Sequence, residues 1–92
     1  MIQVIWDLED DPRGNVRHIA EHDVTPDEVE EVLNDRQSRT VHSMSSGRPI
    51  TFGRTATGRY LAVVWEVADE DPLTVYPVTA YPAREPREER WK

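Results

Sequence analysis

The feature that most constrains the fold of this chain is a pair of β-rich segments joined by an acidic turn, within residues 59–81. The first segment contains an unbroken apolar run, residues 61–65, between Gly58 and the acidic cluster at 68–72. A short run of β-branched and aromatic residues bounded by turn residues is typical of a strand buried on both faces. We therefore predict a central strand over residues 60–67.

The second segment, residues 73–81, is also β-rich but contains Pro77. Proline has no backbone N–H to donate to a neighbouring strand, which favours an edge strand or a β-bulge at this position. An unpaired edge invites pairing with a second copy of the chain or with a strand from a partner. We therefore expect a homodimer or a partner contact through this edge.

The clearest local signal is the start of a helix at Pro26. Thr25 is a good N-cap, Pro26 occupies the first helical position, and Glu28 completes a capping box. Val29, Val32 and Leu33 form one apolar stripe on this helix. We expect the helix to end near residues 34–35.

The other elements are predicted from shorter patterns. Alternation in residues 2–6 predicts a first strand ending at Asp7, and residues 15–22 favour a helix with Val16, Ile19 and Ala20 on one face. Two further strands are expected at 40–42 and 49–54. The order β-α-α-β-β-β-β predicts an α+β domain at 1–81, with two N-terminal helices on a mostly antiparallel sheet of four to five strands. Residues 82–92 are predicted to be a charged, proline-containing tail that is a short helix from Pro86 or disordered.

Charge is distributed unevenly along the chain. The formal net charge of −7 argues against a general nucleic-acid-binding protein, because phosphate binding depends on cationic side chains. Residues 36–65 nevertheless contain no acidic side chain, and their arginines are Arg36, Arg39, Arg48, Arg54 and Arg59. These arginines indicate either one basic surface for RNA or a protein partner, or cations that pair with the acidic helices.

Composition bounds the compartment and the cofactor chemistry. The chain has no cysteine, which excludes disulfides and cysteine ligands and fits a reducing compartment. No apolar run approaches membrane-spanning length, and no basic leader precedes residues 2–6. We expect a soluble cytoplasmic protein with no cofactor.

Several segments together resemble the BrnT branch of the RelE-like toxins. They are Trp6-Asp7, Asn15 with His22 seven residues later, HDVTPDEVEEVL at 22–33 and FGRTATGRYLAVVWE at 52–66. The resemblance covers about residues 4–80. It implies a small α+β fold, endoribonuclease activity, and an antitoxin that neutralises the toxin by direct binding.

Metal-independent cleavage of RNA requires a base for the 2′-hydroxyl, cations for the phosphorus centre, and an acid for the leaving oxygen. The candidates for proton transfer are His22, which carries the resemblance, and Tyr81. Those for charge are Arg54 and Arg84, and Arg59 beside the same turn as Arg54 also qualifies. We expect a pocket between the end of the first helix and the last strand to hold His22, Arg54, Tyr81 and Arg84. Arg36, Arg39, Arg48 and Arg59 are expected to bind RNA or a partner.

A non-catalytic interaction module on the same fold is the alternative function. Glu21 stands where the family usually has Lys or Arg before the histidine, and Tyr81 follows Thr79-Ala80 where the family's last strand ends in Ala-Arg. An Ala-Arg pair appears only later, as Ala83-Arg84. These departures and the acidic charge favour the module, whereas the arginines of residues 36–65 favour the enzyme.

Two other patterns carry weaker hypotheses. The segment His18 to His22 spells H-x-x-E-H, an order found in zinc hydrolases, although such a site needs a third ligand and two polar helix faces explain the pattern equally well. Trp6, Tyr60 and Trp65 are candidates for a platform on which bases stack. Their place in apolar alternation favours core packing instead.

Overall fold

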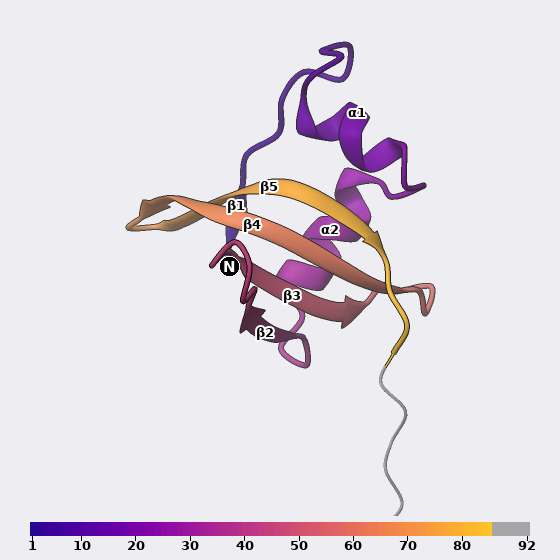
Figure 1. The fold of residues 1–92 in the computed structure, drawn as a ribbon, viewed down its shortest axis with the longest axis vertical. Helices are drawn as coiled ribbons and strands as arrows, with labels where there is room; N and C mark the ends of the chain where they lie inside the picture. Colours follow the sequence, from indigo (N-terminus) through magenta and orange to yellow (C-terminus); the bar gives the residue numbers. More distant parts are fainter. Residues whose placement is uncertain (86–92) are drawn as a thin grey trace, which may run out of the picture.

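The computed structural model describes residues 1–85, and it confirms an α+β fold with two helices and a five-stranded, mostly antiparallel sheet (Figure 1). The predicted order of elements is also confirmed. The elements are β1 (Gln3–Val4), α1 (Asn15–Ala20), α2 (Pro26–Leu33), β2 (Arg39–His42), β3 (Pro49–Arg54), β4 (Tyr60–Glu70) and β5 (Leu73–Pro82). The predicted helix at Pro86 and most of the predicted tail lie outside the described residues.

The strands are arranged in the order β1-β5-β4-β3-β2, so β4 is central, as its apolar run predicts. The prediction that residues 73–81 form an edge strand is wrong. β5 lies between β4, to which it is antiparallel, and β1, to which it is parallel through Thr74 and Val75. β1 therefore prevents another strand from pairing with the first part of residues 73–81.

Pro77 lies at a β-bulge, which is the other arrangement predicted for it. Thr79 pairs with Val64 and Pro77 pairs with Trp65, so Val78 is the extra residue on β5. The Pro77 carbonyl accepts a hydrogen bond from Asn15 Nδ2 at 3.1 Å, on the side away from β4. The missing N–H of Pro77 faces that same side, where β1 has already ended, so no ladder bond is lost.

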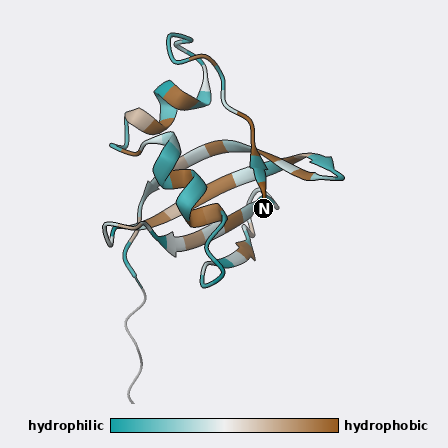
Figure 2. Cartoon of the chain, turned by 180° about the vertical axis from the view of Figure 1, so that it is seen from behind, coloured by the Kyte–Doolittle hydropathy of each residue, from teal (hydrophilic) through white to brown (hydrophobic). Residues whose placement is uncertain are grey.

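One face of the sheet carries the hydrophobic core. Leu61 and Val63 of β4 and Val75 of β5 are fully buried, and they pack in one cluster with Ile19 of α1. The other members of this cluster are Val24, Val29, Val32, Leu33 and Ala80. α1 packs against β5, and α2 packs against β3 and β4. α2 lies behind the sheet in Figure 1 and in front of it in Figure 2, and α1 reaches the same core cluster through Ile19.

The predicted start of α2 is confirmed, because its signals are local. The Thr25 hydroxyl accepts from the Glu28 N–H, and the Glu28 carboxylate accepts from the Thr25 N–H. The helix comes so close to β3 that a Cβ on Gly53 would lie 2.1 Å from Ser38 Oγ and 3.1 Å from Val32 Cγ1. Glycine is therefore required at residue 53 for close packing of the helix on the strand.

The first strand and the first helix are shorter than predicted. β1 covers only Gln3–Val4. The carbonyl of the next residue, Ile5, accepts a hydrogen bond from Asn15 Nδ2 at 3.0 Å, which ends the pairing of β1 with β5. α1 ends at Ala20, which is exposed and does not join the buried Ile19. None of the helices in residues 1–85 is long and apolar enough to cross a membrane.

Candidate functional site

The opposite face of the sheet, which no helix covers within residues 1–85, holds a row of large side chains. Arg39 of β2 pairs with Phe52 of β3, Phe52 pairs with Ala62 of β4, and Ala62 pairs with Tyr81 of β5. Directly paired residues point to the same face of a sheet, and each strand adds about 4.8 Å. We call this surface, with the adjoining Arg54 and Tyr60, the open face.

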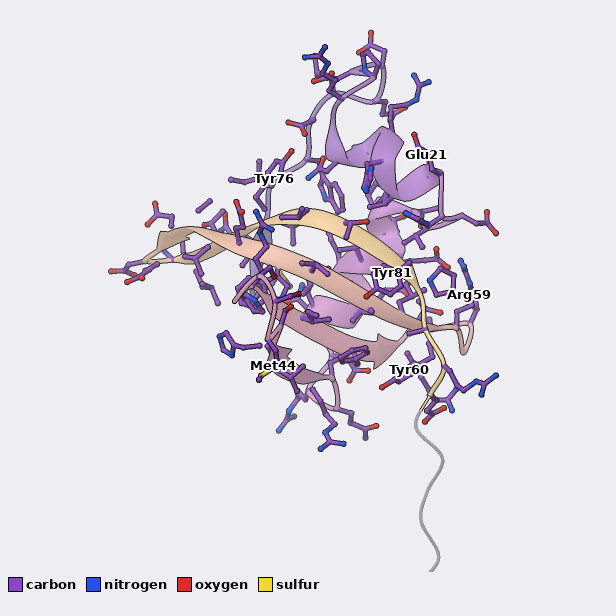
Figure 3. The ribbon with its side chains drawn as sticks, viewed as in Figure 1. Glu21, Met44, Arg59, Tyr60, Tyr76 and Tyr81 are labelled. Carbon is purple, nitrogen blue, oxygen red and sulfur yellow. The ribbon has the colours of Figure 1, made fainter. Side chains whose placement is uncertain are left out.

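Two aromatic rings form the centre of the open face. Tyr60 pairs with Arg54, one step along from Phe52, and the Phe52 and Tyr60 rings stack with centroids 6.2 Å apart and planes 16° apart. Both rings are half-buried. They line two adjoining hollows of about 230 and 220 Å³, which also share Arg39. Figure 3 shows Tyr60 and Tyr81 toward the end of the sheet where β4 begins and β5 ends.

His22 reaches this region from the turn after α1. Its ring lies against that of Tyr81 in an edge-on arrangement, with centroids 6.2 Å apart. His18, one helical turn earlier, lies 5.6 Å from the His22 ring on the other side. The structure therefore brings together His22 and Tyr81, the two residues predicted to transfer protons.

Arg54 and Arg84, the two predicted cations, line the adjoining hollows. Arg54 donates one hydrogen bond to the Gly58 carbonyl at 3.1 Å and forms an ion pair with Glu85. Arg84 lines the second hollow beside Phe52 and Tyr60. Within residues 1–85, neither Arg54 nor Arg84 forms a hydrogen bond or an ion pair with His22 or Tyr81. The predicted four residues therefore lie in two places, with His22 against Tyr81 and the two arginines in the adjoining hollows.

Arg59 forms hydrogen bonds that its position in the sequence does not predict. Its Nη1 donates to both Glu28 carboxylate oxygens, at 2.9 and 2.8 Å, and to the Asp23 carbonyl at 2.9 Å. Asp23 has a positive φ of 64°, and Glu28 is the capping residue of α2. Arg59 thus fixes the turn between the helices to the start of β4, which favours the interpretation that it pairs with the acidic helices.

The other predicted RNA-binding or partner-binding arginines differ in their surroundings. Arg48 forms an ion pair with Glu66 at 2.7 Å, toward the other end of the sheet. Arg36 is exposed in the turn before β2, and Arg39 lines both hollows of the open face. Of the predicted binding arginines, Arg39 is therefore the one placed beside the aromatic pair.

The predicted aromatic platform of Trp6, Tyr60 and Trp65 is not assembled. Both tryptophans pack against the core, where Trp6 Nε1 donates to Glu30 at 2.8 Å and Trp65 Nε1 donates to Thr51 at 2.8 Å. Only Tyr60 lies on the open face, and its partner there is Phe52. Alternation in residues 49–54 places Phe52 on the face opposite Thr51 and Gly53, and the burial of those two residues in the structure shows that the Phe52 face is the outer one.

The H-x-x-E-H pattern gains no further ligand. Within the described part of the chain, no three His, Asp or Glu side chains are grouped as metal ligands would be. Glu21 and His18 instead line a third hollow with Asn15 and Tyr76, beside the bulged part of β5. This hollow lies at the edge of the sheet and not at the aromatic pair.

A polar network next to this third hollow joins the loop after β1 to β5. The Tyr76 hydroxyl donates to Asp7 Oδ2 at 2.5 Å, and the Asn15 N–H donates to the same oxygen at 2.8 Å. Asn15 is 2% exposed, and its side chain also accepts from the Asp7 N–H. The hydrogen bond from Tyr76 and then that from Asn15 lower the pKa of Asp7, and the bond to Asp7 raises the pKa of Tyr76 to about 12. The network fixes the loop and satisfies its buried polar atoms.

Comparison with protein-family models, curated proteins and solved structures finds no match. The chemistry of the open face must therefore be argued from its own residues.

Proposed function

We propose that this chain is a BrnT-like, RelE-like toxin-type protein that cleaves RNA without a metal and is neutralised by an antitoxin that binds it directly. The observation that carries the proposal is the contact of His22 with Tyr81, at the end of the register row that continues through Ala62 to Phe52 and Arg39. A proton-transfer pair beside aromatic and cationic side chains is the combination that RNA cleavage needs.

The proposed reaction uses the ribose as its own nucleophile. His22 accepts the proton of the 2′-hydroxyl, and the 2′-oxygen forms a bond to the adjacent phosphorus. The bond from phosphorus to the 5′-oxygen breaks, and the Tyr81 hydroxyl donates a proton to that oxygen. The products are a 2′,3′-cyclic phosphate and a 5′-hydroxyl. Arg54 and Arg84 stabilise the extra negative charge on the phosphoryl oxygens.

A non-catalytic interaction module is the second candidate function, and the ion pairs favour it. Arg48 forms an ion pair with Glu66, and Arg59 forms one with Glu28. These carboxylates lower the positive electrostatic potential that the sequence indicates for the two arginines. The formal net charge of −7 also opposes RNA unless a local basic surface outweighs it. In this function the open face would bind a protein partner.

The test is induced expression in a bacterial host, with growth and total RNA integrity as readouts. We expect growth arrest and RNA fragments with 5′-hydroxyl ends from the wild type. His22→Ala combined with Tyr81→Phe should abolish both effects. His42→Ala combined with Arg48→Ala is the matched control, because it removes an exposed histidine on β2 and an arginine paired with Glu66, both away from the His22–Tyr81 contact. Normal growth and intact RNA at good soluble expression of the wild type would favour the interaction module.

A further inference from the structure

The two hollows on the open face share an aromatic floor and one arginine, and the first hollow is also lined by the acidic Asp35 and Glu85. Phe52 and Tyr60 line both, and their nearly parallel rings are partly accessible. Arg39 also lines both hollows. Aromatic rings next to arginine side chains are the surface on which single-stranded nucleic acids stack their bases, without strong preference for one base.

At one end of this surface, a carboxylate of the chain itself already forms an ion pair with an arginine. Glu85 follows β5 and forms an ion pair with Arg54, and both residues line the first hollow. The segment is held in place because the Ala83 N–H donates to the Tyr60 carbonyl at 2.9 Å. A guanidinium offers the same N–H donors to a carboxylate and to a phosphate. Glu85 therefore stands where a phosphate group would bind.

We propose that the surface over Phe52 and Tyr60 binds a nucleotide unit of single-stranded RNA, and that its phosphate displaces Glu85 from Arg54. The base stacks on the two rings, and Arg39 and Arg84 contribute further positive charge. The ligand class rests on the proposed function, but binding at this site does not require cleavage. Glu85 is then a built-in competitor that lowers the affinity of the protein for RNA.

The ion pair between Arg48 and Glu66 provides a matched control. The side chains of Glu66 and Glu85 are 48% and 45% exposed, and each binds one arginine. Glu66 does not line either hollow of the open face. Glu66→Gln and Glu85→Gln therefore change the net charge equally, and only Glu85→Gln releases Arg54.

The experiment measures binding of a short fluorescent oligoribonucleotide with 2′-fluoro in place of each 2′-hydroxyl, which cannot be cleaved. Fluorescence anisotropy should show about threefold tighter binding for Glu85→Gln than for the wild type, the size expected from one exposed ion pair. Glu66→Gln should bind like the wild type. Equal gains for the two variants would reduce the effect to net charge and overturn the proposal, as would binding by none of the proteins.

A second variant tests the aromatic floor. Phe52→Leu keeps an apolar side chain but removes the ring, and it should weaken binding about tenfold, as loss of a stacked base contact does. If circular dichroism shows that Phe52→Leu does not fold, Tyr60→Leu takes its place. Unchanged affinity in the folded variant would overturn the proposed site.

The outcomes separate this inference from the proposed ribonuclease activity. Binding that is enhanced by Glu85→Gln alone, together with intact RNA on expression, would keep the site and exclude the nuclease. RNA cleavage that needs His22, together with equal responses to Glu85→Gln and Glu66→Gln, would keep the nuclease and exclude Glu85 as a competitor.

Discussion

On the side of the sheet covered by α1 and α2, large apolar residues such as Leu61 and Val63 are fully buried, whereas on the open face Phe52 and Tyr60 are only half-buried. The polar groups differ in the same way. Asn15 is buried and hydrogen-bonded on several sides, while Arg54 and Glu85 form an ion pair that is about half exposed. Burial on one side stabilises the fold, because buried apolar area and satisfied polar groups dominate stability. The open face contributes less, so its side chains are available for binding.

The largest expected effect comes from breaking the covered side. Leu61→Ala should lower the free energy of unfolding by about 3 kcal/mol, because it leaves a cavity in the core cluster. Phe52→Leu, on the adjacent strand but the open face, should cost less than about 1.5 kcal/mol, because Phe52 is only half-buried and leucine keeps an apolar side chain there. Urea unfolding followed by tryptophan fluorescence measures both. Similar losses would show that the two faces contribute equally to stability.

The next largest effect concerns the buried amide at the end of β1. Asn15→Ala removes the donor to the Ile5 and Pro77 carbonyls and should lower the free energy of unfolding by about 2 kcal/mol. Hydrogen exchange should show faster opening of the loop after β1. Retained stability together with slow exchange would mean that water replaces the amide without cost.

A smaller effect distinguishes two arginines that the sequence presents alike. Arg59→Gln should cost about 1 kcal/mol, because it removes the contacts with Glu28 and with the Asp23 carbonyl at the start of α2. Arg48→Gln should cost less than about 0.5 kcal/mol, since its pair with Glu66 is exposed. Thermal unfolding of both variants measures the difference. Equal melting temperatures would contradict the structural role of Arg59.

The smallest effect appears only at the two extremes of pH. The folded-state pKa of Tyr76 is raised to about 12, so its contribution to stability is full below the ordinary pKa of about 10 and is lost as the pH rises through 12. The pKa of Asp7 is lowered, so its contribution is full above about pH 4 and is lost as the pH falls through the lowered pKa.

Spectrophotometric titration of the folded protein should therefore show a late tyrosine phase near pH 12, and Tyr76→Phe should abolish it. Tyr81→Phe, which removes a hydroxyl that is not bonded to Asp7, should leave the late phase in place. Loss of the late phase in Tyr81→Phe, with its persistence in Tyr76→Phe, would contradict the assignment of this phase to Tyr76.

Local signals account for the parts of the fold that the sequence predicts. The capping box of Thr25 and Glu28 spans four residues, so the start of α2 is determined by neighbours in the chain. The strand at residues 49–54 and the central position of β4 follow from apolar patterning of single segments.

Distant pairings account for the parts that it does not predict. The insertion of β5 between β1 and β4 depends on contacts such as Gln3 with Thr74, which no local pattern encodes. Arg59 finds Glu28 only because the start of β4 lies beside α2. The sequence does not single out Phe52, because an aromatic residue in an amphipathic strand can occupy either face until the register of the strand is known.

The position of β5 has a consequence for synthesis of the chain on the ribosome. The helices and β2, β3 and β4 emerge first, yet Val75 and Ala80, which complete the core beneath the helices, come from a strand made later. β1 also cannot pair until β5 is made, because β5 is its one neighbour in the sheet within residues 1–85. Tyr81 belongs to the same late strand, so the contact with His22 forms only after the ribosome has passed it. A nascent chain interrupted before residue 73 therefore has neither a complete core nor an assembled site.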